Sequence, residues 1–111
     1  MFGVPGGQTM ALYDAILDMA PALTHVLLRD ERSAAYAADG YARVTGQVGV
    51  CDATVGPGAA KLPSGLGEAL GASVPVLAIV SGGVLDGSLI LSVTGSITMR
   101  RGTSVSSLTK C

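Results

Sequence analysis

Residues 29–46 read RDERSAAYAADGYARVTG, and this stretch decides the fold. Asp30 is suited to cap a helix N-terminus, because its carboxylate can accept from backbone N–H groups of the first turn. Alanine recurs through the middle of the stretch and loses no side-chain entropy on entering a helix. Asp39 and Arg43 are four residues apart and are expected to pair on the exposed face. Gly46 is suited to end the helix that these signals predict.

The predicted helix, Glu31–Thr45, carries many small side chains, so we expect it to lie very close to whatever it packs on. Glu31 stands in its first turn, at the mouth of a strand-to-helix connection. An acidic side chain there is favoured by the positive end of the helix dipole. The residues alone therefore allow a structural reading of Glu31 as well as a functional one.

Strand and helix patterns alternate along residues 1–81. The apolar run 74–80 is typical of a strand buried on both faces of a parallel sheet. Thr9 is the expected N-cap of the first helix. The predicted strands are 24–28, 48–53 and 74–80, and the predicted helices are 9–19, 31–45 and 58–72. This alternation predicts an α/β fold, with an open, mostly parallel sheet and flanking helices.

Residues 82–111 differ from the preceding part, because they are rich in Ser, Thr and Gly and lack a helical period. Apolar and polar side chains alternate over residues 89–100, which predicts one or two extra strands. Asp86-Gly87 is a candidate hairpin turn. We therefore divide the chain into a domain of residues 1–81 and a strand-forming tail. Truncation, rearrangement or a changed reading frame would each explain the tail.

Composition excludes several classes of protein. A chain of 111 residues with a net charge of −1 is one domain without a basic surface for nucleic acid. No apolar run reaches the roughly 18 residues that a membrane span needs. The N-terminus lacks a basic signal region, so we expect a cytoplasmic protein. His25 is the only histidine, which excludes a histidine-rich metal site within one chain.

Three motifs in one order resemble the pyrimidine-binding domain of thiamine-diphosphate enzymes, above all the acetolactate synthase branch. The family carries FGxPGG, then a helix of the type HEQxAxxxAxGYAR, then TSGPGxxN after a strand. Here residues 2–7 read FGVPGG, the helix reads DERSAAYAADGYAR, and residues 54–58 read TVGPG. The resemblance covers residues 1 to about 81. The helix that opens the family's domain has no counterpart, so we expect the chain to begin late in that domain.

The resemblance implies a catalytic role for Glu31. In the family, a glutamate at this position bonds a ring nitrogen of the cofactor's aminopyrimidine and relays the proton taken from the thiazolium carbon. The implied cofactor-binding residues lie in the two glycine loops: Pro5, Gly6, Thr54, Gly56 and Pro57. The sequence departs from the family's motif at two nearby positions: Val55 replaces the family's serine, and Lys61 replaces its asparagine. Both replacements are expected to remove hydrogen-bonding side chains from the pocket.

The resemblance also implies the partners. This chain would take only the aminopyrimidine end of thiamine diphosphate, while the diphosphate and Mg²⁺ would need a partner domain or chain. The expected function is part of a carboligase or decarboxylase of 2-oxo acids, inactive without that partner. The alternatives are a catalytically silent, self-associating fragment and a small heterocycle-binding module. The low charged fraction, 14%, favours a homo-oligomer, most simply a dimer.

Overall fold

A single five-stranded sheet organises the structure. The computed structural model describes residues 1–81 and the backbone of strand 89–94. The strands lie in the order β2-β1-β3-β4-β5; β1 to β4 are parallel, and β5 is antiparallel to β4. Their bounds are β1 (Phe2–Gly3), β2 (Val26–Leu27), β3 (Gly49–Thr54), β4 (Val76–Ser81) and β5 (Leu89–Thr94). The predicted open, mostly parallel sheet is confirmed, and β5 is the extra strand expected from the tail.

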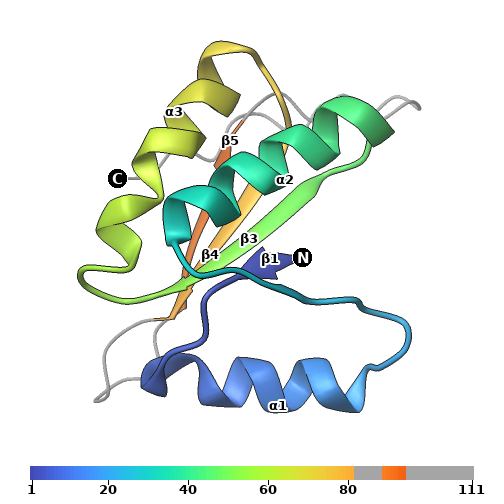
Figure 1. The fold of residues 1–111 in the computed structure, drawn as a ribbon, viewed down its shortest axis with the longest axis vertical. Coiled ribbons are helices and arrows are strands. Elements are labelled where there is room, and N and C mark those ends of the chain that lie inside the picture. Colours follow the sequence, from blue (N-terminus) through green and yellow to red (C-terminus); the bar gives the residue numbers. More distant parts are fainter. Residues whose placement is uncertain (82–88, 95–111) are drawn as a thin grey trace.

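Helices cover the two faces of the sheet unequally (Figure 1). Helices α2 (Glu31–Thr45) and α3 (Pro63–Gly71) lie together on one face, and α1 (Met10–Asp18) lies on the other. Short 3-10 turns, η1 (Gly7–Thr9) and η2 (Ala59–Lys61), precede α1 and α3. The third predicted helix is therefore divided, because Pro63 suits a first helical turn and starts α3. The turn proposed at Asp86-Gly87 lies outside the described residues.

The signals at both ends of α2 act as predicted. The Asp30 carboxylate accepts from the backbone N–H of Arg32 at 2.8 Å, and Gly46 ends the helix at φ 70°. Arg43 Nε lies 2.8 Å from Asp39 Oδ2, so the expected pair forms. The pair does not lie wholly on the exposed face as expected, because Asp39 is buried and only Arg43 is exposed. Arg43 also reaches Glu68 of α3 at 3.3 Å, so the pair joins two helices.

Small residues let α2 lie in direct contact with α3 on one side and with β3 on the other. Ala35 and Ala38 are fully buried. A Cβ atom built on Gly65 of α3 would lie 2.6 Å from the Ala35 Cβ. A Cβ atom on Gly49 of β3 would collide with the backbone carbonyl of Ala38. Glycine on one side and alanine on the other therefore set the distances between α2, α3 and the sheet.

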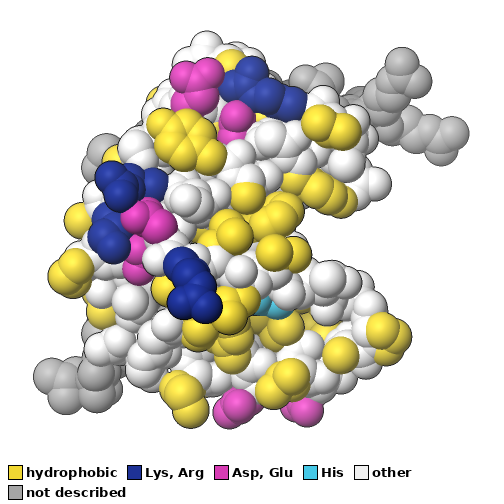
Figure 2. Space-filling view, viewed as in Figure 1, with side chains coloured by type: hydrophobic (Ala, Val, Ile, Leu, Met, Phe, Trp, Pro, Cys, Tyr) yellow, Lys and Arg dark blue, Asp and Glu magenta, His cyan; other side chains and the backbone are white. Residues whose placement is uncertain are grey.

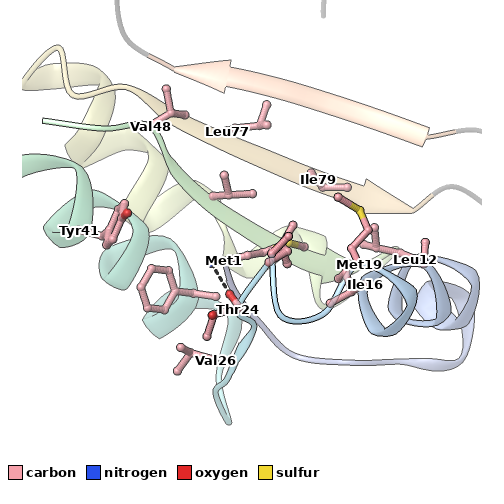
Figure 3. A pocket seen from close by; sticks show the side chains of 15 residues that line it. Met1, Leu12, Ile16, Met19, Thr24, Val26, Tyr41, Val48, Leu77 and Ile79 are labelled. Carbon is pink, nitrogen blue, oxygen red and sulfur yellow. Dashed lines mark hydrogen bonds between the residues drawn. The ribbon is translucent and has the colours of Figure 1, made fainter. Parts of the chain in front are cut away.

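The opposite face of the sheet is only partly covered. Along β4, Val76, Ala78 and Val80 are buried, whereas Leu77 and Ile79 are half-buried. The prediction of a strand buried on both faces is therefore wrong for this strand, because α1 leaves space above it. An apolar groove of about 750 Å³ lies between α1 and the sheet. Figure 2 shows the molecule hollowed there, and Figure 3 shows the side chains that line the space.

A polar cluster joins α1 to the sheet beside this groove. Asp52 of β3 is fully buried, and its carboxylate accepts from the Tyr13 hydroxyl of α1 at 2.7 Å. His25 Nε2 lies 3.0 Å from the other carboxylate oxygen. The same nitrogen lies 3.0 Å from the Tyr13 hydroxyl, so Tyr13, His25 and Asp52 form one connected cluster. Burial, and then the bond to Asp52, raises the pKa of Tyr13 above its ordinary value.

Among the helices of residues 1–81 and 89–94, none combines the length and the apolar character that crossing a membrane requires.

Substituting Ala38 tests the close packing of α2. We expect Ala38→Leu to lower the free energy of unfolding by about 1–3 kcal/mol, because the larger side chain has no space against β3. Urea denaturation measures the change. Val44→Leu is the matched control, because Val44 is on the same helix and 87% exposed. Equal midpoints for Ala38→Leu and wild type would show that this face of α2 has room.

Alkaline pH tests the polar cluster. The pKa of Tyr13 is raised above its ordinary 10.0, so the folded state holds this proton more tightly than the unfolded state does. Its contribution to stability is fully present below about pH 10 and is lost as the pH rises through the native pKa. We expect Tyr13→Phe to unfold with a weaker pH dependence than wild type in this range. Tyr36→Phe, at a 49% exposed site, should retain the wild-type dependence.

Candidate functional site

The three motifs meet at the carboxyl ends of β1 and β3. A Cβ atom on Gly6, in the loop after β1, would lie 2.8 Å from the Thr54 Cβ at the end of β3. A Cβ atom on Gly58, in the loop after β3, would lie 2.8 Å from the Thr54 carbonyl and 3.1 Å from Glu31 Oε1. Thr54 therefore stands between the two loops, and the first turn of α2 closes the site. Ligands of open α/β sheets bind at this edge.

The loop after β1 is held by its own side chains. The Thr9 hydroxyl donates to the Gly6 carbonyl and accepts from the Gly6 N–H, both at 2.8 Å. The Gln8 side-chain oxygen accepts from the Thr54 hydroxyl at 2.8 Å and so links this loop to β3. Thr9 is the N-cap residue of α1 as expected, but its hydroxyl makes no bond to the helix and bonds back to Gly6 instead. Pro5 lies exposed at the surface of the loop.

The loop after β3 presents a glycine and a proline to solvent. Gly56 has φ +78°, a left-handed conformation that favours glycine, and both Gly56 and Pro57 are exposed. Gly58 is buried between Thr54 and Glu31. The structure thus brings Gly6 against Thr54 and places Gly58 between Thr54 and Glu31. It places the exposed residues Pro5, Gly56 and Pro57 on the two loops around them.

Glu31 is buried at the N-terminus of α2 and forms an ion pair. Its side chain is 10% exposed, and Oε2 lies 3.0 Å from the ammonium of Lys61 at the end of η2. The Lys61 side chain is 47% exposed, so it reaches the carboxylate from the solvent side. Beside them, Arg32 holds the pKa of Asp30 down at about 2, through its side chain first and its backbone N–H second.

Sequence reasoning missed Lys61 as a partner of Glu31. Its replacement of asparagine was expected to remove a hydrogen-bonding side chain, but Lys61 donates to the central carboxylate of the site. The replacement of the family's asparagine by Lys61 was the one sequence feature that pointed to this residue. It could not show that Lys61 contacts Glu31, thirty positions away. Thr9 and Gln8 were missed as well, because their bonds depend on how the loop folds. In the described part of the chain, no three His, Cys, Asp or Glu residues gather as a metal site would require.

Known proteins share the sequence of most of this chain. Residues 1–87 match the family model of the N-terminal TPP binding domain of thiamine pyrophosphate enzymes. An acetolactate synthase of Arthrospira platensis is 56% identical over 81 residues, which are 71% of this chain and 14% of that protein. The acetolactate synthase isozyme 2 large subunit of Escherichia coli K12 is 54% identical over 79 residues, again 71% of this chain and 14% of that protein.

A third relative is matched over the same shares of the two chains. The acetolactate synthase large subunit of Pyropia yezoensis is 51% identical over 81 residues, 71% of this chain and 14% of its own length. The chain therefore spans only a small part of each of these relatives. The family match covers most of the chain and includes all three motifs of the site. The chain belongs to the thiamine pyrophosphate enzyme family and carries sequence of its N-terminal TPP-binding domain.

Proposed function

We propose that this chain binds the aminopyrimidine end of thiamine diphosphate as part of an acetolactate synthase-like carboligase or decarboxylase of 2-oxo acids. The observation that carries the proposal is the buried carboxylate of Glu31 against the glycine loop after β3. The names of the relatives support the same chemistry, because those proteins are acetolactate synthases.

The residues present fit a flat heterocycle. Gly58 has no room for a side chain against Glu31 and Thr54, so glycine lets the backbone of this loop lie directly against the carboxylate. Glu31 supplies a carboxylate for a ring nitrogen, and Gly56 and Pro57 offer exposed loop surface beside it. When bound, thiamine diphosphate would supply an acidic carbon whose deprotonated form attacks a carbonyl group. The part of Glu31 would be to hold the ring and move a proton at its own carboxyl oxygen.

The diphosphate and Mg²⁺ would be held outside this chain. The relatives are about seven times longer than the matched segment, which covers 14% of each. We therefore propose a complementary diphosphate-binding chain or domain, without which the site would be inactive. A silent fragment and a heterocycle-binding module are the competing outcomes of titration. Binding only with a partner supports our proposal, no binding in any combination supports the silent fragment, and binding of thiamine alone without dependence on diphosphate supports the module.

Replacing Glu31 tests the proton-transfer role. In a complex reconstituted with a diphosphate-binding chain, Glu31→Gln is expected to lower turnover by about 10²–10⁴-fold, because the amide cannot relay a proton. Steady-state kinetics measure the loss, and circular dichroism reports on the fold. Glu68→Gln is the control, since this side chain is 60% exposed and lies on α3. Equal turnover for Glu31→Gln and wild type would exclude the relay.

A second proposal concerns the oligomeric state of the chain. We propose a homodimer joined through β5, which is the last strand in the described sheet and pairs with β4 on one side. Edge strands present unpaired backbone groups that favour another strand. The alanine face of α2, the other surface considered, is already buried in the chain's own core. Light scattering at low micromolar concentration is expected to give twice the monomer mass, and a monomer would contradict the proposal.

A further inference from the structure

The catalytic carboxylate of the proposed site already has a partner within the chain. Glu31 Oε2 lies 3.0 Å from Lys61 Nζ, and Oε1 faces the backbone of Gly58. No other side chain of the described residues bonds to Glu31. One oxygen is therefore held by an ammonium, and the other is covered by the loop. A ring nitrogen that approaches Oε2 meets Lys61 first.

The two partners differ in how firmly they are placed. Glu31 is fixed at the buried start of α2, with 10% of its side chain exposed. Lys61 ends a three-residue 3-10 turn, and nearly half of its flexible side chain is in solvent. An exposed lysine can swing away without disturbing packed atoms, whereas the glutamate cannot. The pair can therefore open by movement of Lys61 alone.

The other charged side chains near Glu31 do not take the place of Lys61 as its partner. Asp30 is bonded to Arg32 through both its oxygens, at 3.1 and 2.8 Å. Lys61 lies close enough to lower the pKa of Asp30 slightly, as the last of the causes acting on that group. Arg29 is exposed and makes no bond to Glu31 among the described residues. Lys61 is thus the one cation in direct contact with the buried carboxylate in this part of the structure.

We propose that Lys61 is an internal competitor for the heterocycle, which must displace its ammonium from Glu31 before it can bind. The inference rests on the proposed function, because it concerns the same carboxylate. Lys61 Nζ is bonded to Oε2 of the carboxylate, so a ring nitrogen can bond to this oxygen only after the ammonium has moved away. Lys61 therefore acts as a positioning residue that restricts access to Glu31.

Calorimetric titration with thiamine, in the presence of the diphosphate-binding chain that the proposed function requires, tests the competition. We expect Lys61→Met to bind thiamine about two- to fivefold more tightly than wild type, a change of the size that a charge pair with one exposed partner contributes. Lys61→Arg keeps a cation at the carboxylate and should bind as weakly as wild type. Arg29→Met removes the same charge from a neighbouring exposed position and should not change the affinity. Melting temperatures confirm that each variant is folded.

A second set of variants separates a direct effect on Glu31 from a structural one. In the Glu31→Gln background, Lys61→Met should leave thiamine affinity unchanged, because no charge pair remains to be broken. A gain that persists in this background would overturn the inference. Should Lys61→Met fail to fold, the wild type still decides the question through the nitrogen-15 resonance of the Lys61 ammonium. Thiamine should shift it, and an unshifted signal at saturating thiamine would overturn the inference.

The outcomes also separate this inference from the proposed function. If wild type and Lys61→Met bind thiamine equally, the pyrimidine site stands and the competition is excluded. Weaker binding by Lys61→Met would also overturn it, since Lys61 would then contact the ligand. If no variant binds thiamine, with or without a diphosphate-binding chain, the proposed function is wrong and the inference is overturned with it.

Discussion

The contact of α2 with the sheet is the constraint on which the rest of the structure depends. Ala38 lies against Gly49 so closely that a single added carbon would collide with backbone. This contact fixes the height of α2 above β3. Gly65 and Ala35 fix its distance from α3 in the same way. Because the first turn of α2 carries Glu31, helix packing many residues away determines where the carboxylate of the site lies.

The features set by local chemistry could be predicted from the sequence. The bounds of α2 follow from Asp30 and Gly46, which satisfy backbone groups at its two ends, and the structure confirms both. The positions of the two glycine loops and of Glu31 could also be predicted, because each follows a strand in the order expected for an α/β sheet. Strand β5 was expected from the alternation of apolar and polar side chains, and its antiparallel pairing with β4 is the arrangement that a hairpin connection gives.

The features that depend on distant residues could not be predicted. Lys61 and Glu31 are 30 positions apart, and only the packing of η2 beside α2 brings their charges together. Asp52 lies in a strand that reads as apolar, and its burial requires polar partners, Tyr13 and His25, on two other segments. The one-sided burial of β4 depends on how far α1 stands from the sheet. The distance between α1 and the sheet cannot be predicted from a local sequence pattern.

The groove beside α1 has a thermodynamic consequence. Leu77 and Ile79 keep contact with water in the folded state, so unfolding newly exposes less apolar surface than in a sheet covered on both faces. The heat capacity of unfolding grows with that newly exposed surface. The fold is therefore expected to have a low heat-capacity increment for its length, and its stability will vary with temperature along a flatter curve.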